Sequence, residues 1–167
     1  MFTVDTWVTL RAVASFEFSA PSGVTGTSEA GDQFGHRVVL APPGLSDSKT
    51  RLAVSTPNED SFATDTGLVQ VFPLDDLAAE ATYEQERDTV PGDPAANEHF
   101  GEGLGFVARV AERSILVGVP DDAQNPTGMV NVIPLTGGSQ RTWIPGTGRL
   151  PTTGLDRFGG AAGGEVQ

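Results

Sequence analysis

The sequence predicts an all-β protein made of β-propeller blades, each a sheet of four antiparallel strands. The apolar segments are short, rich in Val, Ile, Leu and Phe, and bounded by Gly, Pro, Asn or Asp, as strands and turns are. An ordered set of motifs recurs about every 60 residues, which indicates an internal repeat. Gly and aromatic residues keep their places in each unit, as in propeller blades. A parallel β-helix would need much shorter coils, and a sandwich would not repeat itself.

The repeat begins with the dipeptide Phe-Gly, which has an acid two residues before each Phe. An apolar run ending in Pro follows, a polar loop leads to a Gly that opens a strand, and an aromatic segment closes the unit. The motif residues are Phe34, Gly35, Pro57, Gly67, Phe100, Gly101, Pro120, Gly128, Phe158 and Gly159, and the acids are Asp32, Glu98 and Asp156. We interpret Phe-Gly as a close approach to a neighbouring strand. The acids are expected to accept hydrogen bonds from loop N–H groups.

Each unit is expected to contain four strands. They are 38–40, 52–57, 67–74 and 83–85 in the first unit, and 105–107, 115–120, 128–135 and 142–144 in the second. The second strand is almost continuously apolar and should be covered on both faces, whereas the Gly-initiated strand alternates as a half-buried strand does. Segment 75–81 is too short for an independent helix and is predicted as a turn or loop. The predicted core includes Leu52, Val54, Ile115, Val117, Phe34 and Phe100.

Counting strands divides the chain into four parts. Residues 1–33 form half a blade, with strands at 2–7 and 15–18. Residues 34–99 and 100–157 are whole blades, and 158–167 start a further one. Because an open arc of blades leaves unpaired edges and an uncovered apolar face, we expect the chain to self-associate or to belong to a longer propeller.

Composition excludes several classes of function. Among 167 residues, 22 are acidic and 10 are Lys or Arg, so the net charge is -12. No basic cluster is present to release counterions, so a nucleic-acid partner is not expected. No apolar run approaches the length of a membrane span, and the first residues do not resemble a signal peptide. The absence of Cys excludes disulfides, thiolate catalysis and Cys-ligated zinc.

The order and spacing of Phe-Gly, Pro and Gly resemble the FG-GAP repeat, which builds the seven-bladed propeller of integrin α subunits and of many secreted bacterial proteins. The linkers 23–35 and 90–101 are similar to those of actinobacterial members. The resemblance implies an extracellular or cell-surface module that binds a protein or glycan without catalysis. The alternatives are the scaffold portion of a larger secreted hydrolase, whose catalytic domain lies elsewhere, and a purely structural fragment.

Members of that family often carry an Asp-rich calcium loop between the first two strands of a blade. The corresponding segments, 41–50 and 108–113, lack alternating carboxylates, so no cofactor is expected there. The acidic turns after the second strands offer weaker calcium candidates, and solvated carboxylates are the competing interpretation. These candidates are Asp60, Asp65, Asp121 and Asp122.

No catalytic residue stands out in the sequence. Gly-x-Ser-x-Gly, the signature of a serine hydrolase, does not occur. His36 and His99 flank the Phe-Gly motifs at different offsets without an evident third ligand, so both are predicted to be structural or exposed. Trp7, Tyr83 and Trp143 are predicted to pack, with a sugar- or peptide-gripping role at the rim as the alternative.

Overall fold

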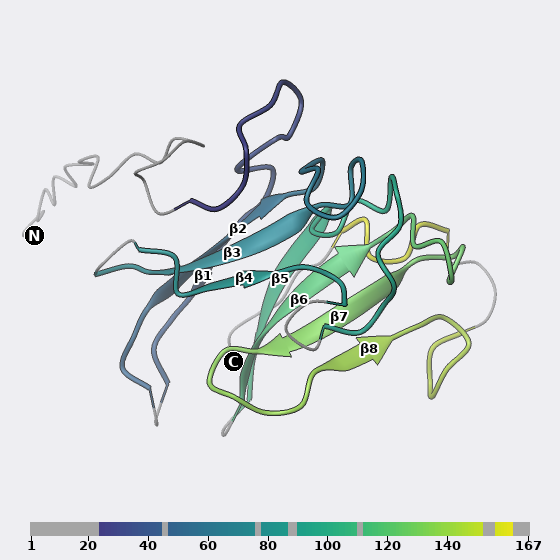
Figure 1. Cartoon of the computed structure of the whole chain (residues 1–167). Coiled ribbons are helices and arrows are strands. Elements are labelled where there is room, and N and C mark those ends of the chain that lie inside the picture. The colour runs from purple at the N-terminus through teal and green to yellow at the C-terminus, as the bar shows by residue number, and fades with distance from the viewer. Residues whose placement is uncertain are drawn as a thin grey trace, which may run out of the picture.

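The computed structural model describes residues 24–44, 47–75, 78–86, 90–109, 112–151 and 156–161. Within these ranges the regular structure is entirely β, with no helix. The strands form two four-stranded antiparallel sheets, which lie beside each other in Figure 1. The predicted all-β class is therefore confirmed. No helix in this part of the chain is long and apolar enough to cross a membrane.

Each sheet is a simple meander in which every strand pairs with the next along the chain. Sheet A consists of β1 (Val38–Ala41), β2 (Arg51–Thr56), β3 (Leu68–Pro73) and β4 (Ala81–Tyr83). Sheet B consists of β5 (Gly103–Ala108), β6 (Arg113–Val119), β7 (Met129–Pro134) and β8 (Arg141–Trp143). All eight strands overlap the segments that the sequence predicted, because short apolar runs bounded by turn residues determine them.

The two sheets pair equivalent positions of the repeat. In sheet A, Val54 of β2 lies opposite Gln70 of β3, and in sheet B Val117 lies opposite Asn131. Gln70 and Asn131 are fully buried. Each contacts a threonine of the last strand, since Gln70 Nε2 lies 3.5 Å from Thr82 Oγ1 and the hydroxyl of Thr142 donates to Asn131 Oδ1 at 3.1 Å. The recurring polar pair shows that the repeat extends from sequence to structure.

One apolar core joins the two sheets. Sheet A contributes one face of its central strands, and sheet B contributes the face formed by β5, β6 and β7. The buried members are Ala53, Val69, Val71, Val90, Phe100, Leu104, Ile115, Val117, Val119, Met129 and Ile133. The opposite face of sheet B carries a smaller cluster of Leu116, Val130 and Val132, with Val107 and Phe158 packed against it.

Burial corrects two predictions. The Gly-initiated strands β3 and β7 are buried at all six positions, not half-buried, and β7 has apolar neighbours on both faces. Val54, Ile115, Val117 and Phe100 are buried as predicted, but Leu52 and Phe34 are only half-buried. Leu52 points away from sheet B, and no sheet among the described residues precedes the turn of Phe34 as sheet A precedes that of Phe100.

The Phe-Gly turns repeat one backbone conformation. Gln33, His99 and Arg157, which precede each Phe, all have positive φ, as do Gly35, Gly101 and Gly159. In each turn the residue after Gly donates a backbone hydrogen bond to the carbonyl of the residue before Phe, at 2.9, 2.9 and 3.0 Å. Positive φ at the residue before Phe and at the glycine after it gives a tight reversal. The sequence did not reveal this turn, because three different residue types precede Phe.

The second Phe-Gly turn docks at the start of β3, a central strand of sheet A. The Phe100 amide donates to the Thr66 carbonyl at 2.9 Å, and the Gly101 amide donates to the Gly118 carbonyl at 3.0 Å. A Cβ added to Gly67 would lie 2.4 Å from the Phe100 carbonyl oxygen, so only glycine fits there. The same contact recurs at the next junction, where a Cβ added to Gly128 would lie 2.2 Å from the Phe158 carbonyl oxygen. The predicted close approach is thus confirmed at two junctions.

The acids before the turns act partly as predicted. Asp32 accepts a hydrogen bond from the Glu29 amide at 2.6 Å, and Glu98 accepts from the Ala95 and Ala123 amides at 2.8 and 2.9 Å. Asp156 is exposed. Of segment 75–81, residues 76 and 77 lie outside the described ranges, as do the predicted strands 2–7 and 15–18 and the residue Trp7.

Candidate functional site

The loops between the second and third strands of both sheets meet around the second Phe-Gly turn. The His99 amide donates to the Asp65 carbonyl at 3.1 Å in the β2–β3 loop. The His99 ring also contacts the β6–β7 loop, with Nδ1 3.1 Å from Asp121 Oδ2. His99 thereby links the two acidic turns, which lie in the β2–β3 and β6–β7 loops and are called the loop rim.

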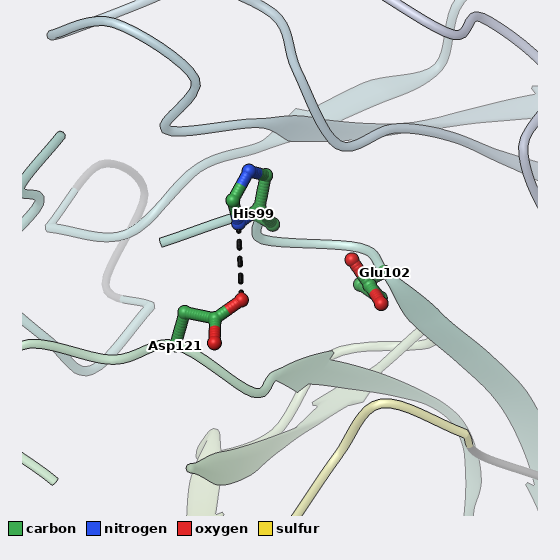
Figure 2. Close-up of side chains that lie close together, drawn as sticks. All are labelled: His99, Glu102 and Asp121. Atoms are coloured by element: carbon green, nitrogen blue, oxygen red, sulfur yellow. Dashed lines mark hydrogen bonds and ion pairs between the residues drawn. The ribbon is translucent and has the colours of Figure 1, made fainter. Parts of the chain in front are cut away.

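Figure 2 shows three polar side chains converging at this junction: His99, Glu102 and Asp121. The turn brings His99 and Glu102 together, and the segment after β6 supplies Asp121. Each residue offers one nitrogen or oxygen ligand atom, and these atoms lie within 4.8 Å of one another. All three side chains are about one quarter exposed, at 24%, 29% and 27%. The cluster is therefore open to solvent, and two of its members belong to one hydrogen-bonded turn.

Arg157 from the third Phe-Gly turn also reaches this cluster. Its guanidinium donates to Asp121 Oδ1 at 2.6 Å and to Glu102 Oε1 at 3.1 Å. The Arg157 side chain is 52% exposed, so these ion pairs contribute little to stability. Arg157 thus bridges both carboxylates and balances one of their two charges, and His99 contacts the second oxygen of Asp121.

A second acidic feature lies beside the first Phe-Gly turn. Glu29, Asp32, Asp60 and Asp65 contribute to a cavity of about 370 Å³. Glu59 is 4% exposed, and burial raises its pKa to about 7, an effect that the nearby Asp32, Glu29 and Asp60 reinforce and the Thr27 amide opposes. Glu59 therefore exchanges its proton near neutral pH.

Glu98 lies two residues before Phe100, the position that Asp32 holds before Phe34 in the first repeat. It is fully buried, and burial raises the pKa of its carboxyl despite the two amides that donate to it. Those amides, of Ala95 and Ala123, belong to the linker before the turn and to the β6–β7 loop. Glu98 thus fastens the linker to the rim, which is a structural role.

A larger cavity lies at the same rim, next to the end of β4. Its volume is about 520 Å³, and it is lined by Ser61, Phe62, Glu84, Gln85 and Glu86. Phe62 is 70% exposed, more than any other large apolar side chain in the described ranges. Gln85 is buried and donates to Asp122 at 3.1 Å, so the wall of the cavity is tied to the β6–β7 loop.

The four weak calcium candidates have different surroundings. Asp60 is exposed and accepts from the Asp65 amide at 2.8 Å. Asp122 is buried and accepts from the amide and side chain of Asn125 at 2.6 and 2.8 Å. Only Asp121 belongs to a three-residue ligand group among the described residues. The structure thus groups Asp121 with His99 and Glu102 and not with the other candidates.

Several site residues were missed or placed differently by sequence reasoning. His99 contacts Asp121 and lies near Glu102, although no third ligand was evident from spacing. His36 is half-buried, with Nε2 lacking a hydrogen-bond partner. Tyr83 packs against the core, whereas Trp143 is 39% exposed on β8. No sequence signal marked Phe62, because it stands alone in a polar loop.

Comparison with known proteins finds no match: no family model, no curated protein and no solved structure is significantly similar to the chain. The FG-GAP resemblance accordingly stays a prediction based on the motifs.

Proposed function

We propose that the chain is a non-catalytic binding module, in which the two sheets are propeller-like blades and the loop rim holds a protein or glycan ligand. The observation that carries the binding role is Phe62, exposed beside the 520 Å³ cavity. A large exposed aromatic beside a hollow is a typical anchor for a partner's side chain.

The charge of the rim favours a protein ligand over a glycan. Glu84 and Glu86 line the cavity next to Phe62, and the chain as a whole carries a charge of -12. Carboxylates pair with Lys and Arg, and a strongly acidic surface accelerates the approach of a basic partner. The ligand that fits best is a peptide segment with an apolar side chain for Phe62 and neighbouring basic residues.

The blade interpretation is supported by comparing equivalent positions. Val38 and Leu40 of β1 occupy the places that Leu104 and Phe106 occupy in β5. Leu104 and Phe106 are 3% and 4% exposed, since they lie on the face of sheet B that packs against sheet A. Val38 and Leu40 are 55% and 54% exposed. The β1 part of this face therefore suits a further sheet, from a second copy or from the rest of a longer propeller, whereas Val54 and Phe72 on the same face are already buried.

Selection from a displayed random-peptide library tests the binding role. We expect enriched peptides to combine Lys or Arg with an aromatic or aliphatic residue and to bind more weakly in high salt. Phe62→Ala should abolish their binding. Leu74 is the matched control, since it is an apolar residue 45% exposed at the other end of β3, and Leu74→Ala should leave binding unchanged. Enriched peptides without basic residues, or equal binding to Phe62→Ala, would contradict the proposal, and preferential capture of neutral oligosaccharides would favour a glycan ligand.

The non-catalytic part of the proposal has a separate test. Chromogenic ester and glycoside reporters should give only background rates with the purified chain, because no Ser or Thr hydroxyl in the described ranges is hydrogen-bonded to a histidine base. A rate above background that survives repurification would instead support a hydrolase.

A further inference from the structure

The His99 cluster has the chemistry of a metal site that the binding role does not use. His99 provides an imidazole nitrogen, and Glu102 and Asp121 provide carboxylate oxygens, with the ligand atoms within 4.8 Å of one another (Figure 2). The His99–Glu102 separation is set by the tight turn, in which the Glu102 amide donates to the His99 carbonyl at 2.9 Å. The donors therefore come from two segments, and one of them is preorganised.

We propose that His99, Glu102 and Asp121 bind one divalent transition-metal ion, of which Zn²⁺ is the best fit. A mixed nitrogen and oxygen set suits Zn²⁺ and its neighbours, whereas Ca²⁺ and Mg²⁺ prefer oxygen alone. Two carboxylates balance the charge of the ion. Three protein ligands leave the fourth position of a tetrahedral zinc site to water.

Arg157 is the competitor for this site. It donates to both carboxylates in the metal-free protein, so an ion must displace it. Because its side chain is 52% exposed, the guanidinium can move into water at little cost. His99 Nδ1 must also exchange its contact with Asp121 for the ion, with the neutral ring carrying its proton on Nε2.

A bound ion would join the second Phe-Gly turn to the β6–β7 loop. Without the ion, the direct side-chain link between these segments in this cluster is the His99–Asp121 contact of 3.1 Å. Ligands that bind only the folded state raise its stability. Metal binding is therefore expected to raise the melting temperature of the protein.

The test is competition for Zn²⁺ between a chromophoric chelator and the chelator-stripped 167-residue protein at pH 7.5. We expect one saturable equivalent. Loss of an outer partner of a ligand already weakens metal sites about 10–100-fold, so His99→Ala and Glu102→Gln should weaken binding at least tenfold. Arg157→Gln should tighten it, because the competitor is gone. Circular dichroism and thermal unfolding show whether each variant remains folded.

The chain offers a matched control, because it contains only two histidines. His36→Ala should bind Zn²⁺ like the wild type, and NMR should show the His99 ring signals moving on Zn²⁺ addition while those of His36 stay. Equal binding by His99→Ala, displacement of Zn²⁺ by equimolar Ca²⁺, or uptake without saturation would overturn the proposal. Those results would mean that the acidic surface attracts cations without a specific binding site.

Discussion

Replacement of Gly67 by Ala tests how the second Phe-Gly turn is seated on sheet A. Gly67 has φ +80°, and an added Cβ would lie 2.4 Å from the Phe100 carbonyl oxygen and 2.7 Å from that of Pro57. Gly137 is the matched control, since it has φ +86° and open space around the same position. Both substitutions incur the strain of a left-handed alanine, but only the first also forces the turn away.

The expected losses in the free energy of unfolding follow from these two contributions, backbone strain and overpacking. A left-handed L-residue costs about 1–2 kcal/mol, which is the whole expected effect of Gly137→Ala. Overpacking against backbone adds about 1–3 kcal/mol, so Gly67→Ala should lower the free energy of unfolding by about 2–5 kcal/mol. The backbone oxygens that it meets belong to Phe100 and Pro57, so no flexible side chain can yield.

Urea unfolding followed by fluorescence and circular dichroism measures both changes. The two variants should differ by more than 1 kcal/mol, with similar denaturant slopes if unfolding stays two-state. Equal losses for Gly67→Ala and Gly137→Ala would refute the docking of Phe100 against Gly67.

Four further outcomes are expected. Phe100→Ala should cost about 3–5 kcal/mol of stability in the same assay, and an unchanged midpoint would show that the ring is not in the core. Because the pKa of Glu59 is raised from 4.5 to about 7 in the folded protein, its protonated form stabilises the fold. That contribution is complete below pH 4.5 and is lost as the pH rises through 7. Stability should therefore fall by up to about 3 kcal/mol between pH 5 and 8, and Glu59→Gln should flatten that pH profile. In native mass measurements, Leu40→Glu should abolish any association between copies while Leu74→Glu leaves it intact, and a wild-type chain that stays monomeric at high concentration would argue against self-association. Millimolar Ca²⁺ should hardly change the melting temperature, so a rise of many degrees that a chelator reverses would contradict the absence of a calcium cage.

The strands could be predicted from the sequence because their signals are local. Apolar runs such as 115–120 end at Pro, and glycines such as Gly128 open the next strand. The repeat then made each assignment in one unit a check on the other. Where a segment had both an apolar run bounded by turn residues and a counterpart in the other unit, the predicted strand is present at that place in the chain.

Burial could not be read equally well, because it depends on which sheet covers a residue. Leu52 and Ile115 hold equivalent positions, yet Ile115 faces the other sheet and Leu52 does not. Phe34 and Phe100 differ for a similar reason. A repeat pattern identifies equivalent residues but not which of them have a neighbour in space.

The candidate sites were less predictable than the strands. His99 and Glu102 meet Asp121 only because a left-handed turn is docked against the loop after β6, a tertiary contact that spacing does not encode. Phe62 is marked by its exposure, and exposure is a property of the folded surface. The acidic turns themselves were located correctly, since polar loops between apolar runs are a local signal.

Amide hydrogen exchange at Phe100 tests most directly whether the second Phe-Gly turn holds the two repeats together as one unit. The Phe100 amide donates to the Thr66 carbonyl at 2.9 Å, and its ring is fully buried. We predict that this amide exchanges as slowly as those in the interior of β6, because it can open only when the junction opens. Exchange as fast as in the exposed loop at 137–139 would contradict the account.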